Sequence, residues 1–254
     1  MFKAFRIFIL LLILAGVALG TWRTGMQSVE WKYRLPVNIY LINGDDSPVA
    51  ADYLRSLTVE DFKPIETFMR DEATRHGQKT SAPIEIRLGG KIENRPPVPP
   101  RNASGLEVGI WSLKMRWWAY WNTDTVGPSP QVKMFVLYFD PAHNKRLAHS
   151  TGLQKGLLGR VNTFAASSMT KQNNVIIAHE FLHTLGATDK YDPANNLPIF
   201  PDGYANPELK PLLPQRFAEI MAGRTPLSIS EAETPAALED ALIGNKTAQE
   251  INWL

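Results

Sequence analysis

The sequence predicts an α/β fold in which helices pack against a mostly parallel sheet. Strand-like and helix-like segments follow one another in the order β-α-β-α-β-β-β-α, and parallel strands need helical crossovers of this kind. The most apolar segment, Val132–Phe139, is short and rich in β-branched and aromatic residues, as a central buried strand is. The chain has 254 residues, 44% of them hydrophobic, which suffices for one substantial core.

The first half of the chain supplies two strands and one helix of this pattern. Residues 36–42 alternate between apolar and polar and are rich in β-branched and aromatic side chains, so they should form a strand. Residues 58–75 carry an apolar stripe at helical spacing. Ile84–Leu88 alternates strictly and should be a second strand. Residues 96–100 include four prolines and are expected to form a stiff surface loop.

A second helix is expected at Gly105–Asn122, which carries four of the seven tryptophans. Its apolar residues at helical spacing are expected to form a core face. An alternative is that its outer tryptophans contact a lipid interface or a partner protein. The stripe assigned to the core consists of Leu106, Ile110, Leu113, Trp117 and Trp121.

The N-terminus has the layout of a secretory signal or a membrane anchor. Lys3 and Arg6 precede an uninterrupted apolar run over residues 7–20. A helix needs about 20 apolar residues to cross a bilayer, so this run is short, but snorkelling basic residues keep a single span feasible. We therefore divide the chain into a signal or anchor segment (1–22), a connection (23–35) and one domain (36–254).

Charge and cysteine content narrow the location and the partners. Positive charge before the apolar run keeps that end in the cytoplasm and places the rest outside it. The domain is therefore expected at the extracytoplasmic face of the cell envelope, either anchored or released after cleavage. A net charge of +2 gives no reason to expect a nucleic-acid partner. Without cysteine, neither disulfides nor thiolate metal ligands can form.

The most informative motif is H-E-x-x-H, formed by His179, Glu180 and His183. A helix has about 3.6 residues per turn, so side chains four positions apart lie on one face and both imidazoles can reach one point. Such a point suits a zinc ion bound by ring nitrogens at about 2.0–2.1 Å. Glu180 lies beside that point and is placed to act as a general base on a water molecule.

The residues around the motif predict where its helix begins and ends. Asn173 or Asn174 can cap the start with a side-chain oxygen. Gly186 can end the helix, because glycine adopts the left-handed conformation without penalty. The chain then turns back, and Asp189 is placed to supply a third metal ligand. Glu208 and Glu219 are alternative candidates for that ligand.

The pattern formed by His179, Glu180, His183, Gly186 and Asp189 resembles the extended zinc signature of the metzincin metallopeptidases. It has the form in which aspartate is the third ligand, as in snapalysin-like enzymes. The resemblance covers roughly residues 130–230. It implies a twisted, mostly parallel sheet with an antiparallel edge strand, packed on two or three helices that include the active-site helix.

The resemblance also suggests roles for residues outside the motif. It implies a methionine turn beneath the metal, for which Met221 is the candidate. Gly223 stands where several metzincins have a tyrosine that assists the transition state, and Tyr191 is a substitute candidate. An extended peptide would bind the edge strand, for which residues 146–152 are the candidate. Residues 192–214 are rich in Pro, Asn and Asp and should form an irregular loop beside the cleft. Near the C-terminus, Thr247 and Glu250 are placed as a capping box.

The function expected from these residues is zinc-dependent hydrolysis of peptide bonds in a peptide or protein substrate. His179, His183 and Asp189 would hold Zn²⁺ and leave one position open, as catalytic zinc sites do. Glu180 would take the proton from the attacking water. Two alternatives remain open: a zinc hydrolase that acts on cell-wall peptide, and a membrane-anchored binding or scaffold protein with this fold.

Overall fold

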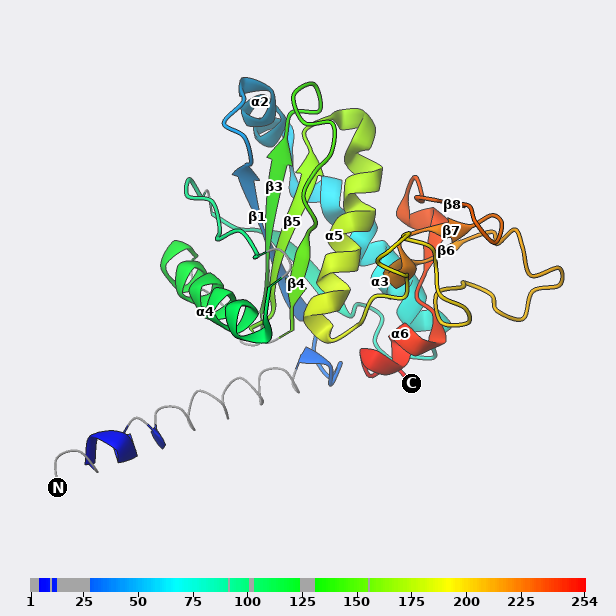
Figure 1. Cartoon of the computed structure of the whole chain (residues 1–254), viewed down its shortest axis with the longest axis horizontal. Coiled ribbons are helices and arrows are strands. Elements are labelled where there is room, and N and C mark those ends of the chain that lie inside the picture. Colours follow the sequence, from blue (N-terminus) through cyan, green and yellow to red (C-terminus); the bar gives the residue numbers. More distant parts are fainter. Residues whose placement is uncertain are drawn as a thin grey trace.

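The structure is a computed structural model that describes residues 5–9, 11–12, 28–90, 92–100, 103–123, 131–154 and 156–254. Its centre is a five-stranded sheet in the order β2-β1-β3-β5-β4 (Figure 1). Four strands are parallel, and β4 pairs with β5 in the antiparallel direction. The expected mixed fold with an antiparallel edge strand is therefore confirmed. The strands are β1 (Leu35–Asn43), β2 (Ile84–Leu88), β3 (Val132–Phe139), β4 (Thr151–Leu153) and β5 (Leu158–Phe164).

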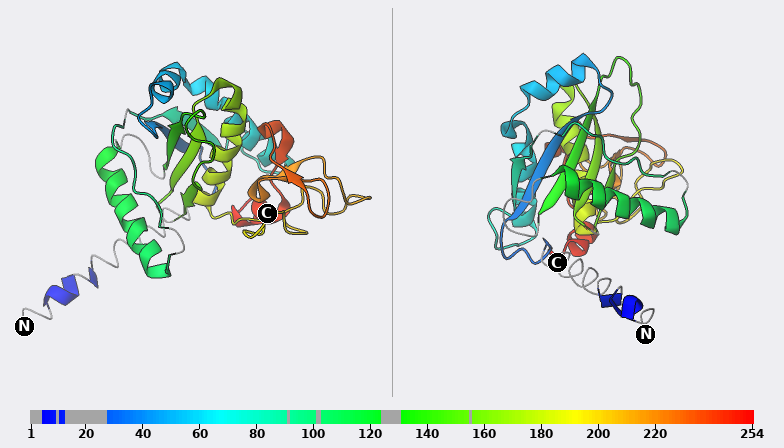
Figure 2. Two further views of the ribbon diagram at one scale, coloured as in Figure 1. Left: turned by 45° about the horizontal axis from the view of Figure 1, so that its top comes forward. Right: turned by 90° about the vertical axis from the view of Figure 1, so that its left-hand side faces the viewer.

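Helices cover both faces of this sheet. Figures 1 and 2 show α4 on one face and α3 with α5 on the other. The helix expected over residues 58–75 is divided into a 3-10 turn and an α-helix, and α2, which follows β1, was not expected. Ser47 explains the start of α2, because its hydroxyl accepts from the backbone N–H of Ala50. Among the described residues between β1 and α5, the helical elements are α2 (Pro48–Ser56), η1 (Val59–Phe62), α3 (Lys63–Arg75), α4 (Gly105–Asn122) and η2 (Ser167–Met169).

The helix that carries the motif, α5 (Thr170–Leu185), begins earlier than its predicted caps. Asn173 and Asn174 are buried inside the helix and do not cap it. The Asn173 amide instead donates to the Phe164 carbonyl at 2.9 Å and accepts from the Phe164 N–H. The Asn174 amide donates to the carbonyl of Asp61 at 2.8 Å. Both asparagines therefore fasten the helix to its neighbours, a long-range role that a local capping pattern cannot reveal.

The two faces of the sheet have separate apolar cores. Side chains alternate along a strand, so Met134 and Val136 of β3 face α3 and α5, whereas Phe135 and Leu137 face α4. The larger core joins α3, α5 and the C-terminal segment to the sheet. This packing fixes the face of α5 that remains for polar side chains.

Helix α4 has the predicted bounds, but the face that packs on the sheet is not the predicted one. The expected core stripe faces solvent, and the buried residues are Trp111, Met115 and Ala119. Trp118 packs edge-on against Phe135 with 4.9 Å between ring centroids. Apolar side chains surround this helix, so periodicity alone did not determine which face packs. The sheet already presents large rings here, and the smaller Met115 and Ala119 allow the helix to approach them.

The C-terminal segment, residues 186–254, lies beside α5 and contains only short elements (Figure 1). Residues 192–214 form no helix and no strand beyond isolated bridges, as expected. Two pairs of short strands, two 3-10 turns and one short helix organise the rest. They are β6 (Ala218–Glu219), η3 (Ile220–Ala222), β7 (Thr225–Pro226), β8 (Ala232–Glu233), η4 (Leu238–Asp240), β9 (Ala241–Leu242) and α6 (Asn245–Glu250).

The predicted apolar run over residues 7–20 falls largely outside the described residues, which include only 7–9, 11 and 12 of it. Within the described part of the chain, no helix combines the length and the hydropathy that crossing a bilayer requires.

Trp31 joins the start of the described body to its C-terminus. Its indole N–H donates to the carbonyl of Ile251 at 2.7 Å, and its ring lies 5.4 Å from that of Trp253. Because Trp31 is buried, we expect Trp31→Ala to lower the free energy of unfolding by about 3–5 kcal/mol. Denaturant unfolding followed by circular dichroism measures this loss. Tyr33→Ala is the control, because Tyr33 is 88% exposed; equal stability of the two variants would contradict the packing.

Candidate metal centre

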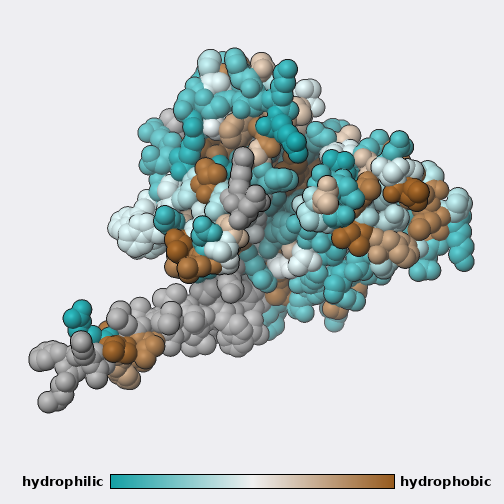
Figure 3. Space-filling view, in the orientation of Figure 1, coloured by the Kyte–Doolittle hydropathy of each residue, from teal (hydrophilic) through white to brown (hydrophobic). Residues whose placement is uncertain are grey.

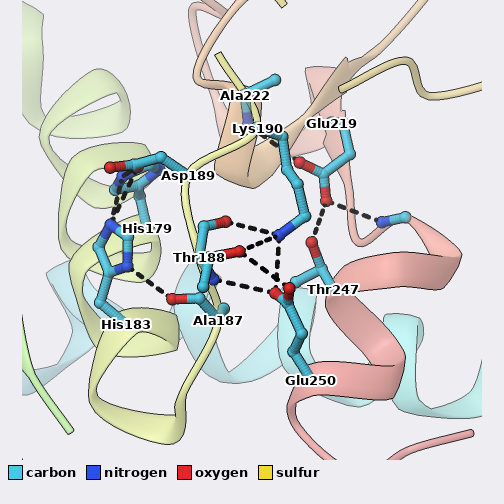
Figure 4. Close-up of polar contacts among 11 residues, drawn as sticks. His179, His183, Ala187, Thr188, Asp189, Lys190, Glu219, Ala222, Thr247 and Glu250 are labelled. Carbon is cyan, nitrogen blue, oxygen red and sulfur yellow. Dashed lines mark hydrogen bonds and ion pairs between the residues drawn. The ribbon is translucent and has the colours of Figure 1, made fainter. Parts of the chain in front are cut away.

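Helix α5 positions both histidines of the motif. Ile177, Phe181 and Leu182 are buried in the core between α5 and the sheet. His179 and His183 lie one turn apart on the side of α5 that faces the C-terminal segment, where Figure 4 shows their rings beside Asp189. The apolar half of the helix therefore fixes the direction of its two imidazoles.

Three possible ligand atoms converge at this point. The Nε2 atoms of His179 and His183 are 3.1 Å apart, and Asp189 Oδ1 lies 3.3 Å from the first and 3.1 Å from the second. Ligand atoms at about 2.0–2.1 Å from a tetrahedral zinc ion are about 3.3–3.4 Å apart, so the observed triangle matches such a centre closely. Within the described residues, these three side chains form the group that could hold a metal ion.

Backbone carbonyls determine which ring nitrogens point into the cluster. The Nδ1 atom of His179 lies 2.8 Å from the carbonyl oxygen of Ile220, and that of His183 lies 2.8 Å from the carbonyl oxygen of Ala187. A carbonyl oxygen only accepts, so each Nδ1 carries a proton and each neutral ring presents its Nε2 lone pair to the cluster. Metal-bound histidines commonly have such a partner on the second nitrogen.

The charges of the cluster favour a bound cation. Burial lowers the pKa of His179, but the hydrogen bond to Asp189 and the negative charge of Glu180 outweigh burial and raise that pKa to about 9. Burial raises the pKa of Asp189, but hydrogen bonds to the two histidines outweigh it and hold the pKa well below its usual range. The site therefore attracts positive charge, which either a proton or a metal ion can supply.

The bend after α5 brings Asp189 back to the histidines. Gly186 adopts the left-handed conformation with φ of 109°. Its N–H bonds to the carbonyl of His183, and the N–H of Ala187 bonds to that of Leu182, which is the Schellman pattern. The predicted role of Gly186 as a helix-ending residue agrees with this geometry. The same bend places the Ala187 carbonyl next to His183.

The position of Asp189 depends on an ion pair that sequence reasoning missed. Thr188 and Lys190 flank Asp189, and both bind Glu250 of α6 (Figure 4). The ammonium of Lys190 lies 2.7 Å from the Glu250 carboxylate and also donates to the Thr188 carbonyl. Burial raises the pKa of Glu250, but the hydrogen bonds from Lys190 and Thr188 lower it overall. The predicted capping role of Glu250 is therefore wrong.

Glu219 is not part of the His/His/Asp cluster, and its carboxylate is hydrogen-bonded elsewhere. Its oxygens accept from the N–H of Ala222, the N–H of Gly244 and the hydroxyl of Thr247, the last at 2.6 Å. Burial raises the pKa of Glu219 despite these bonds. Thr247 thus donates to Glu219, which overturns its predicted capping role. Glu208 is exposed and is not part of the His/His/Asp cluster.

Met221 lies in the turn that supports the centre. The turn η3 contains Ile220, whose carbonyl binds His179, and the Met221 carbonyl accepts from the N–H of Lys190 at 2.9 Å. Glu219 holds the turn from below through the N–H of Ala222. The side chain of Met221 is fully buried. The turn links both His179 and Lys190 to one short segment, and the role of Met221 as a methionine turn stays a prediction.

Glu180 lies beside the cluster with one oxygen unused. It is buried, and its Oε2 has no hydrogen-bond partner among the described residues. Burial raises the pKa of Glu180, which suits a group that must accept and release a proton. Tyr191 hydrogen-bonds Asp189, and burial together with the nearby carboxylates raises the pKa of Tyr191 to about 12. Its hydroxyl is therefore a proton donor throughout the neutral range.

A cavity of about 310 Å³ opens over these residues. Its lining includes His179, Glu180 and Tyr191. One wall is the segment 146–150, of which Arg146, His149 and Ser150 line the cavity. Of the predicted edge segment, residues 146–152, only residues 151–152 belong to strand β4, and residues 146–150 are irregular.

Three hydrogen bonds of Asn162 hold this wall against the sheet, and a close contact of Gly152 holds the following strand against α5. Asn162 of β5 donates from its amide to the carbonyls of Ala148 and His149, and its N–H binds the hydroxyl of Ser150. Gly152 of β4 packs directly on α5, since a Cβ atom there would lie 2.5 Å from the Cβ of His183. Glycine is therefore required where the edge strand crosses the helix.

Comparisons with known proteins add no family to this picture. No protein-family model matches the chain, and no curated protein is significantly similar to it. The resemblance to the metzincins therefore rests on the sequence motif alone. What the site can bind is inferred from the ligand atoms of His179, His183 and Asp189. These residues form a His/His/Asp group that could bind a metal ion, next to a buried carboxylate and an open cavity.

We expect zinc binding to release about one proton per site at pH 6. The raised pKa of His179, about 9, means that this ring is protonated at pH 6 before a metal binds, and a ligand nitrogen must lose its proton. Titration calorimetry in buffers of different ionisation enthalpy counts the released protons. No release at pH 6 would contradict either the raised pKa of His179 or its role as a ligand.

We also expect Glu250→Gln to weaken zinc binding about 10- to 100-fold, as loss of a group that orients a ligand typically does. The variant removes the charge that pairs with buried Lys190 and so frees Asp189 to move. Competition with a chelating dye measures the affinity. Exposed Glu239→Gln is the matched control. An unchanged affinity in the folded Glu250→Gln protein would rule out this support of Asp189.

Proposed function

We propose that this protein is a zinc-dependent endopeptidase of the metzincin type. The observation that carries the proposal is the triangle of His179 Nε2, His183 Nε2 and Asp189 Oδ1, with all three edges between 3.1 and 3.3 Å. The donor set of two neutral imidazoles and one carboxylate is one that zinc accepts, and three protein ligands are typical of catalytic zinc sites. Zinc held there would supply a Lewis acid that polarises a carbonyl and lowers the pKa of a bound water toward about 7.

The protein's own residues would handle the proton. The unused Oε2 of Glu180 is placed to accept the proton of the attacking water and to pass it to the nitrogen of the leaving amine. Burial keeps the pKa of Glu180 above its usual value, so the carboxyl can hold the proton between these two steps. The hydroxyl of Tyr191, which donates to Asp189, lines the same cavity and is the candidate for contact with the developing oxyanion.

A peptide substrate is supported by the edge of the sheet. β4 is an edge strand that borders α5, and an extended chain can add to such an edge through backbone hydrogen bonds. This contact would lay the substrate along the wall formed by residues 146–150. A cell-wall peptide could bind in the same way, so cleavage assays must distinguish it from an ordinary peptide or protein substrate.

A purely structural role is less well supported. Glu180 is buried with one oxygen unpartnered, and an unpaired buried polar group costs about 1–3 kcal/mol or more. A scaffold would gain stability by replacing it, whereas a catalyst needs a free carboxylate oxygen at this position. We further propose that the enzyme works at the extracytoplasmic face of the envelope, held to the membrane by its N-terminal apolar run or released from it.

We expect Glu180→Gln to retain zinc but to lose cleavage by about 10²–10⁴-fold, because glutamine cannot accept the proton. His183→Ala should lose both zinc and activity. Elemental analysis of the purified full chain gives the zinc content, and a quenched-fluorescent peptide library and purified cell-wall peptide give cleavage. Undiminished hydrolysis by Glu180→Gln would refute the role of Glu180, and a native protein that takes up no zinc would refute the proposal.

A further inference from the structure

The exposed face of α4 carries a continuous apolar surface that the metal centre does not use. Its members follow one another at intervals of three, four or one positions and so lie along one side of the helix. Leu113 is 64% exposed and Trp117 is 67% exposed. In Figure 3, brown and near-white residues gather over this part of the molecule. The surface, called the α4 stripe below, consists of Leu106, Ile110, Leu113, Trp117, Tyr120 and Trp121.

The α4 stripe has no partner within the described part of the chain. The opposite side of α4 already packs on the sheet through Trp111, Met115 and Ala119. The helix is thus apolar on both sides, one used by the core and the other left in solvent. A contiguous exposed apolar surface of this kind marks an interaction site.

The composition of the stripe favours a lipid interface. Trp117, Tyr120 and Trp121 form a ring cluster with centroids 5.6 and 5.3 Å apart, and such amphipathic rings concentrate at the level of lipid headgroups. Between residues 106 and 121 the helix has two basic residues, Lys114 and Arg116, and one acidic residue, Glu107, which binds Ser104 at the start of the helix. Basic and aromatic residues beside aliphatic ones are typical of helices that lie in the surface of an anionic bilayer.

The topology brings the stripe to the end of the domain where the N-terminal chain enters. β1 and β3 are parallel, so both begin at the same end of the sheet. Lys133, at the start of β3, donates to the hydroxyl of Thr123, which directly follows α4. The C-terminal end of α4 therefore lies at the end of the sheet where β1 and β3 begin. The N-terminal chain reaches β1 at Leu35, and Figure 1 shows this entry and α4 at the same end of the sheet.

The apolar run thus lies within a short tether of α4. Residue 20, where the run ends, is 15 positions before Leu35, and such a segment spans at most about 50 Å when fully extended. Attachment of the run to a bilayer would hold α4 close to the same surface. We propose that the α4 stripe is a second membrane contact, which lies in the headgroup region of an anionic phospholipid bilayer.

This orientation has a consequence for the metal centre. α4 and α5 lie on opposite faces of the sheet, so α5 and the cavity beside it are on the side of the sheet away from the bilayer (Figure 2). The proposal does not depend on hydrolytic activity, and its test requires none.

The absence of cysteine from the chain allows a clean labelling test. Leu113→Cys, carrying a small fluorophore, is placed in the full chain and reconstituted in vesicles of phosphatidylglycerol and phosphatidylethanolamine. The matched control is Ile229→Cys, between β7 and β8, which is 89% exposed. Spin-labelled lipid should quench the label at position 113 at least threefold more than the label at 229, and aqueous iodide should show the reverse order.

Each other outcome overturns the proposal. Quenching of the position-113 label by iodide, as strongly as at 229, would show that the stripe stays in water. Protection from both quenchers would show that protein covers the stripe, through a second copy or through the N-terminal run of the same chain. Vesicles of zwitterionic lipid alone test the charge: equal lipid quenching there would remove the preference for anionic lipid. Circular dichroism confirms that each labelled variant is folded.

Discussion

Three acceptor atoms forced to within 3.1–3.3 Å of one another are the constraint on which the site depends. Two lone pairs and a carboxylate at that distance repel unless a positive charge lies among them. The carbonyls of Ile220 and Ala187 hold one proton of each histidine on the far nitrogen, so the positive charge must come from a second proton or from a metal ion. The helix, its terminal bend and the turn around Met221 hold the three atoms in this arrangement.

The C-terminal segment is as important to the centre as the motif helix. It supplies Asp189, the carbonyl that orients His179, and the buried pair of Lys190 and Glu250 that fixes the loop between them. Glu219, which is buried in this segment, ties the turn at 220–222 to Gly244 and Thr247. The candidate metal centre is therefore assembled from two parts of the chain, and the C-terminal part must be folded for Asp189 and the Ile220 carbonyl to reach the histidines of α5.

The sequence predicted the local features of the site and failed on the long-range ones. Spacing alone placed His179, Glu180 and His183 together, and the glycine bend pointed to Asp189, because both effects act within one or two helical turns. The role of Glu250 depends on a contact across sixty residues with Lys190, which no local pattern encodes. The orientation of α4 failed for a different reason: apolar residues surround the helix, and only the rings already present on the sheet decided which side could approach.

Gly152 sets the spacing between the edge strand and the motif helix with backbone atoms alone. A Cβ at this position would meet the carbonyl oxygen of Glu180 at 2.4 Å, so no side chain acts as an adjustable spacer at the crossing. The depth at which an extended ligand lies relative to the two imidazoles is consequently a property of the main chain. If an extended ligand pairs with β4 as proposed, the side chains of residues 146–150 would select which ligands are accepted, while the distance from the paired backbone to the imidazoles would stay constant.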